Sequence, residues 1–155
     1  MPSSAVDEAA EAALAASRAL VGVAVRSLAA VEGDVTLPQY RALVLLAVRG
    51  PHNVGALADA LDVQPSSMTG LCDRLVAKGL VIRKPSTASR REVTVSISAR
   101  GRALVNAVAS RRVRELRRIF STLDAPQLRR IVDAFASFAR AAGELPDDAW
   151  RVGWT

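Results

Sequence analysis

Residues 64–97 constrain the fold most, because an amphipathic helical pattern passes there directly into two β-branched segments. In the helical part, Met68, Leu71, Cys72 and Leu75 follow the i, i+3, i+4, i+7 spacing of a buried helix face. The β-branched part comprises "LVIRK" and the alternating "EVTVSIS", joined by the turn segment "PSTASRR". We therefore expect a helix followed by a β-hairpin.

The opposite face of this helix carries Ser66, Ser67, Gly70 and Arg74. An ordinary solvated face favours Glu, Lys and Gln, which keep both helix propensity and charge. Ser, Thr and Gly instead weaken a helix by roughly 0.5 to 1 kcal/mol each relative to Ala. Small side chains with hydroxyl groups suit a face that must approach the base edges of DNA closely.

Helical patterns also precede and follow this unit. Residues 5 to about 31 predict a long helix, Pro38 opens the short apolar helix "QYRALVLLAV", and "NVGALADALDV" predicts a third helix. After the hairpin, Ser98 caps a long helix, and Asp124 with Gln127 forms a capping box that opens the last one. This order predicts a mainly α fold with a small β-hairpin wing, whose middle is a winged helix-turn-helix.

Positive charge is concentrated beside the predicted hairpin. Residues 74–102 hold eight basic groups and one acid, Glu92, whereas the other 126 residues have a net charge of −1. A basic cluster on a near-neutral scaffold is typical of binding to a phosphate backbone, so double-stranded DNA is the expected partner. The alternative is a solvated basic face.

Several classes of protein are excluded or disfavoured by composition. The amino terminus has neither the basic region nor the apolar run of a secretory signal, and no membrane-spanning segment is expected, so we predict a cytoplasmic protein without a membrane partner. One cysteine and one histidine, Cys72 and His52, cannot form a Cys/His metal cluster. The chain also lacks the G-x-S-x-G, G-x-G-x-x-G and P-loop patterns, so we expect neither an enzyme nor a cofactor.

Three motifs, "ALADALDV", "DRLVAKGLV" and "RREVTVSISARG", occur in this order within residues 37–105. As a set they resemble the MarR family of bacterial transcription regulators. The resemblance implies a homodimer that reads a pseudo-palindromic site, and in many members a small phenolic or anionic effector releases the DNA. It divides the chain into an N-terminal dimerisation helix (5–36), the winged helix-turn-helix (37–98), C-terminal dimerisation helices (99–143) and a tail (144–155).

The resemblance also assigns site residues by position. The reading face of the recognition helix would comprise Ser66, Ser67, Thr69, Gly70 and Arg74, and Arg91 would be the wing-tip arginine that enters the minor groove. We expect Arg83, Lys84 and Arg90 to lie near phosphates. Two positions depart from the family pattern: Ser89 stands where an acid usually orients the wing arginine, and Gln64 is a poor helix cap.

Other residues leave two interpretations open. Cys72 could be a redox sensor, but its apolar neighbours favour a buried small hydrophobe. Tyr40 could line the effector crevice or belong to the core, and His52 is expected in an exposed loop. Trp150 and Trp154 could belong to a frayed end or dock on the partner or the crevice.

The arginines of the long helix after the hairpin, from Arg111 to Arg118, are expected to form mostly a solvated face, with Arg111 and Glu115 spaced for an i, i+4 ion pair. For Arg74 the alternative to DNA contact is a surface ion pair with Asp73. The predicted function is a sequence-specific, ligand-responsive DNA-binding repressor. The competing function is a winged helix that binds DNA without sequence specificity or serves as a protein-interaction module.

Overall fold

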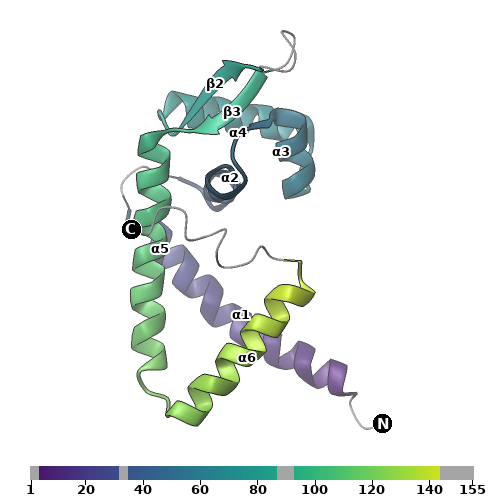
Figure 1. Ribbon diagram of the computed structural model, residues 1–155, viewed down its shortest axis with the longest axis vertical. Helices are drawn as coiled ribbons and strands as arrows, with labels where there is room; N and C mark the ends of the chain where they lie inside the picture. Colours follow the sequence, from purple (N-terminus) through teal and green to yellow (C-terminus); the bar gives the residue numbers. More distant parts are fainter. Residues whose placement is uncertain (1–3, 32–34, 87–92, 144–155) are drawn as a thin grey trace.

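The computed structural model describes residues 4–31, 35–86 and 93–143. Short strands and three helices form a winged part, from which a long helix extends to two further helices (Figure 1). The elements are α1 (Ala5–Ala29), α2 (Leu37–Arg49), β1 (His52–Asn53), α3 (Val54–Leu61), α4 (Pro65–Ala77), β2 (Val81–Pro85), β3 (Val93–Ile97), α5 (Ala99–Phe120) and α6 (Ala125–Ala141). The mainly α fold with a β-hairpin wing is confirmed.

Local capping explains where most helices begin. Ser4, Thr36 and Asp124 cap α1, α2 and α6, and each belongs to a capping box completed by the third helical residue. Asn53 and Ser98 cap α3 and α5 with single side-chain hydrogen bonds. These short-range signals are visible in the sequence, so the predicted helix starts agree with the structure.

The sheet has three strands in the order β1-β3-β2, all antiparallel. The hairpin β2–β3 was expected, with Val81 opposite Ile97 and Pro85 opposite Val93. The strand β1 was not expected, and the prediction that His52 lies in a loop was wrong, because His52 pairs with Val95. Two residues carry too little β pattern to predict a strand; β1 forms only because the fold brings it beside β3.

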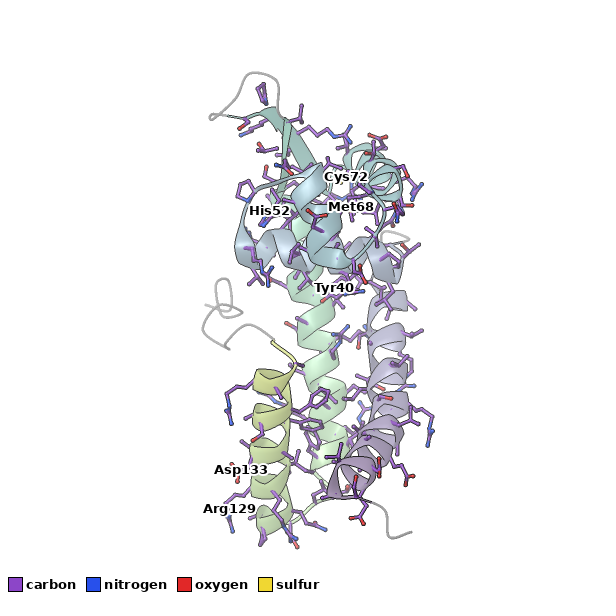
Figure 2. All side chains as sticks on the ribbon, turned by 90° about the vertical axis from the view of Figure 1, so that its right-hand side faces the viewer. Tyr40, His52, Met68, Cys72, Arg129 and Asp133 are labelled. Carbon is purple, nitrogen blue, oxygen red and sulfur yellow. The ribbon has the colours of Figure 1, made fainter. Side chains whose placement is uncertain are left out.

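The core lies between α2, α3, α4, the sheet and the first turns of α5. Leu43, Leu57, Met68 and Leu75 are among its fully buried side chains. Cys72 is also fully buried, and its label lies beside that of Met68 in Figure 2. The prediction of a small core hydrophobe is confirmed. The buried face of α4 thus packs into the core, and its opposite face is exposed.

Helices α1 and α6 flank the part of α5 that extends away from the winged part (Figures 1 and 2). Arg26 of α1 forms an ion pair with Glu115 of α5, so the expected pair of Arg111 with Glu115 was wrong. The i, i+4 spacing is shared by many surface pairs of little energetic weight, and the neighbouring helix offers Glu115 a competing cation.

Much of α1 and α6 is apolar and exposed. Phe138 and Val132 of α6 are 61% and 66% exposed, and Leu14 and Val21 of α1 are 61% and 56% exposed. Helix α1 is also long and apolar enough to span a membrane by length and composition, with a mean hydropathy of 1.4 over 18 residues. The expectation that no segment meets this criterion was therefore wrong. Alanine and valine together make α1 more apolar than its few large side chains suggested.

Candidate DNA-binding surface

Helix α4 is positioned by its apolar face and by the turn that follows it. Pro65 occupies its first position, and Gln64 makes no side-chain capping hydrogen bond, as its poor capping propensity predicts. The helix ends before Gly79, which has φ of +69°, a conformation that favours glycine. The backbone N–H of Leu80 donates to the carbonyl oxygen of Leu75 at 2.9 Å and closes this end.

The outer face of α4 carries the residues that the sequence analysis assigned to it. Ser66, Ser67, Thr69 and Arg74 are exposed, and Gly70 is half-buried. The Thr69 hydroxyl donates to the carbonyl oxygen of Pro65 at 3.0 Å, which leaves the hydroxyl oxygen free to accept. The face therefore offers small polar groups and one guanidinium on a rigid helix.

Arg74 and Gly70 lie together on this face. The Arg74 Nη1 atom is 3.7 Å from the point that a Cβ atom on Gly70 would occupy. The guanidinium thus lies back along the helix, over the residue one turn earlier. Because Gly70 has no side chain, the helix surface does not protrude there, and the hydrogen-bond donors of Arg74 lie beside it.

Asp73 forms an ion pair with Arg83 of β2 rather than with Arg74, with 2.5 Å between its Oδ1 and Arg83 Nη1. The alternative interpretation of Arg74, a surface pair with Asp73, is therefore not supported. Arg83 pairs here with a carboxylate of the recognition helix. The expectation that it lies near phosphates stays a prediction. Sequence analysis missed this pair because ten positions and a tight turn separate its members.

The wing is described on both strands up to residues 86 and 93. Lys84 is exposed on β2, and its carbonyl oxygen accepts a hydrogen bond from the Thr94 hydroxyl at 3.3 Å. Ser89, Arg90 and Arg91 lie outside the described residues. Arg102, at the end of the basic cluster, donates from Nη1 to the carbonyl oxygen of Ala47 at 3.4 Å. Its side chain therefore contacts the C-terminal end of α2.

Tyr40 lies on the inner side of α2, only 5% exposed, beneath Arg112 of α5. The Arg112 guanidinium carbon is 5.6 Å from the centre of the Tyr40 ring, within the range of a cation–π interaction. Burial raises the pKa of the Tyr40 hydroxyl, and the Arg112 charge partly opposes this shift. Tyr40 belongs to the core cluster, as one interpretation held, and it also lines a cavity. Its role in an effector crevice stays a prediction.

This cavity has a volume of about 340 Å³ and runs along α2 between α1, α3 and α5. Three guanidiniums line it, and among the described residues no carboxylate does. The lining residues are Ala24, Leu37, Tyr40, Arg41, Val44, Leu45, Val48, Arg49, Ala60, Leu61, Arg112 and Gly143. The Nε atom of Arg112 is buried without a hydrogen-bond partner among the described residues. The sequence analysis missed the three arginines because only the fold brings them together. Trp150 and Trp154 lie outside the described residues.

Comparison with known proteins places this arrangement in a family. The MarR family model matches residues 35–93, from the start of α2 into the wing. The HTH-type transcriptional repressor MdtR of Bacillus subtilis is 30% identical over 108 residues, which cover 70% of each protein. The chain belongs to the MarR family. It is thus a DNA-binding transcription regulator, and the prediction that it is no enzyme is confirmed.

A solved structure and a further relative are also similar to this chain. The crystal structure of RV1404 from Mycobacterium tuberculosis has a TM-score of 0.86 and 38% identity, and the match covers 93% of this chain and 98% of that one. The uncharacterised HTH-type regulator ML2140 of Mycobacterium leprae is 40% identical over 84 residues, 54% of this chain. That match spans only 57% of the length of ML2140.

Proposed function

We propose that this MarR-family protein is a homodimeric repressor that reads a pseudo-palindromic DNA site and releases it when a small anionic effector binds. The observation that carries this proposal is the exposed face of α4, where Ser66, Ser67, Gly70 and Arg74 surround a surface low enough to enter the major groove. MdtR, which is a repressor, supports the sign of regulation.

Sequence readout by this face follows from its chemistry. Arginine donates two parallel hydrogen bonds to guanine O6 and N7, and serine hydroxyls donate or accept at several base edges. Thr69 keeps its acceptor capacity because its proton is used within the helix. Arg74 is therefore assigned to a base edge, and the hydroxyls to adaptable contacts at neighbouring bases or phosphates.

The wing supplies contacts outside the major groove. The exposed Lys84 suits a phosphate contact that adds affinity without sequence preference. Arg90 is assigned to a neighbouring phosphate. Arg91, which belongs to the segment outside the described residues, is assigned to the adjacent minor groove, whose negative potential attracts arginine in A·T-rich sequence.

The homodimer would cover the apolar surface of α1 and α6. Phe135 and Phe138 are 41% and 61% exposed on α6, and Leu14 and Val25 are 61% and 52% exposed on α1. Large exposed apolar side chains gathered on two helices suit a protein–protein or membrane contact. A second copy that covers α1 explains its composition without a bilayer and agrees with a cytoplasmic, DNA-binding protein.

The effector would occupy the cavity beside Tyr40. Its apolar wall suits an aromatic or aliphatic body, and Arg41, Arg49 and Arg112 suit a carboxylate. The buried Nε of Arg112, which has no hydrogen-bond partner in the part of the chain that the structure describes, suits such a ligand as a donor. Solved structures of the same fold include a mutant of MepR from S. aureus bound to an oligodeoxyribonucleotide and NadR in complex with 4-hydroxyphenylacetate.

Selection of bound duplexes from a random pool tests the proposal. A homodimeric reader enriches a motif repeated with two-fold symmetry, its half-sites about one helical turn apart. Addition of 4-hydroxyphenylacetate, as a representative aromatic acid, then tests effector release. Retention of duplexes without any enriched motif would favour the alternative, a winged helix that binds the DNA backbone alone.

A further inference from the structure

An ion pair between Asp73 and Arg83 joins the recognition helix to the wing. Asp73 belongs to α4 and Arg83 to β2, the first strand of the wing. Their side chains are 55% and 33% exposed, so the pair lies at the surface that α4 and the wing share.

Asp73 places a carboxylate on the DNA-facing side of α4. Asp73 is three residues after Gly70 and seven after Ser66, so it shares their side of α4. A carboxylate on that side repels the phosphates that the helix must approach. Arg74, as the next residue, does not face it, whereas Arg83 reaches it from β2.

The pair connects α4 to the wing at a point beyond the turn that joins them. At the base, the backbone N–H of Leu80 donates to the Leu75 carbonyl oxygen, and the Ser98 hydroxyl donates to the Gly79 carbonyl oxygen at 2.7 Å. Beyond that turn, the Asp73–Arg83 pair holds β2 at a point nearer the wing tip. Strand β2 is also paired with β3 from Val81 to Pro85, so the ion pair acts on the orientation of the hairpin as a whole relative to α4.

We propose that Asp73 is a positioning residue, which acts through Arg83 to set the angle of the wing against the recognition helix. The wing and α4 must reach neighbouring grooves together, so a fixed angle favours the matched site over other sequences. This inference rests on the proposed DNA-reading function. It assigns the Arg83 charge to Asp73 instead of to a phosphate.

The test is the sign of the effect of Asp73→Asn on binding to the selected duplex, measured by fluorescence anisotropy. Removal of an acid near DNA by itself strengthens binding, because repulsion of the phosphates falls. The proposal requires the opposite: about a three- to tenfold weaker affinity for the selected duplex, within the usual range for coupled residues. Affinity for a scrambled duplex should stay the same or rise.

Arg83→Gln and the double variant complete the cycle. If the two side chains act as one unit, Arg83→Gln weakens binding about as much as Asp73→Asn does. The double variant then shows the same loss as either single variant, and the salt dependence of binding is unchanged. A drop of about one in the salt slope for Arg83→Gln would make Arg83 a phosphate contact and overturn the proposal. Arg83→Lys, which keeps the charge, should recover part of the loss.

Two controls distinguish failure of the positioning role of Asp73 from failure of the proposed DNA-reading function. The thermal midpoint should change little in each variant, because exposed ion pairs contribute little to stability. Stronger or unchanged binding by Asp73→Asn, with wild-type preference for the selected duplex intact, overturns the positioning role alone. Absence of that preference in the wild type overturns the proposed function together with this inference.

Discussion

The guanidinium of Arg74 lies over Gly70, with Nη1 3.7 Å from the place of the missing Cβ atom. The two residues therefore share one small area of the recognition face. A Cβ atom there makes an ordinary van der Waals contact with Arg74 and meets no backbone. At position 70, helix stability favours alanine, whereas close approach to DNA favours glycine because it leaves more room.

Gly70→Ala is expected to stabilise the fold and weaken specific DNA binding. Alanine in a helix interior is favoured over glycine by about 0.8–1.0 kcal/mol, and nothing nearby must move. The added methyl group raises the surface beside Arg74 and limits approach to the bases. Thermal unfolding and anisotropy on the selected duplex measure both effects. Unchanged affinity would mean that Gly70 does not lie against DNA.

Arg74→Ala is expected to weaken specific binding by about 1 to 3 kcal/mol, as for loss of a bidentate contact to guanine. The dimer should remain intact, because Arg74 is exposed on α4, which lies at the other end of the molecule from α6 and most of α1 (Figure 1). Arg129→Ala on α6, which Figure 2 labels far from α4, is the matched loss of one exposed arginine. Equal effects of the two substitutions would remove Arg74 from the reading face.

Arg91→Ala is expected to reduce affinity most for sites with A·T-rich flanks, where the minor groove is narrow and attracts arginine. Lys84→Ala should instead reduce affinity about equally on all flanks and lower the salt slope by about one. Anisotropy on duplexes that differ only in their flanks distinguishes the two. The same loss on A·T and G·C flanks for Arg91→Ala would identify a phosphate contact.

Phe138→Asp is expected to weaken or abolish the homodimer. The ring is 61% exposed on one chain, so a charge there is costly only if a second copy covers it. Light scattering after size exclusion should show the wild type as a dimer and the variant shifted toward monomer. Asp133→Asn, on the same helix, serves as the control. A monomeric wild type would contradict the proposed assembly.

Cys72 is expected to react slowly with thiol reagents in the folded protein. Burial raises the pKa of its thiol, with the Arg83 charge opposing the shift, so less thiolate forms at a given pH than in free cysteine. The folded state holds this proton more tightly. The free energy of unfolding should therefore decrease as the pH rises above the pKa of the unfolded thiol. Reaction with a disulfide reagent at equal rates with and without denaturant would show that Cys72 is accessible.

Sequence reasoning predicted the parts of the fold that depend on local chemistry. Capping residues such as Ser4 and Asp124 fix helix starts through hydrogen bonds within three positions, and the spacing of Met68 to Leu75 shows which face of α4 is buried. Strand β1 escaped prediction because its two residues become a strand only by pairing with β3.

In the candidate site too, features within one helix were predictable, whereas contacts between elements were not. The reading face of α4 is one helical surface, so its members could be named from spacing and resemblance. The partners of Asp73 and Glu115 lie on other elements, and the three arginines of the cavity come from two helices. Such contacts depend on tertiary packing, which no local pattern encodes.

Anisotropy of the wild-type protein on a duplex from its own promoter region, against a scrambled duplex and across a salt series, tests most directly whether α4 reads base sequence. A sequence reader should prefer the promoter duplex by about 10³-fold or more, with affinity that falls steeply as salt increases. Equal binding to both duplexes, and to the duplex chosen by selection from the random pool, would contradict sequence readout by this surface.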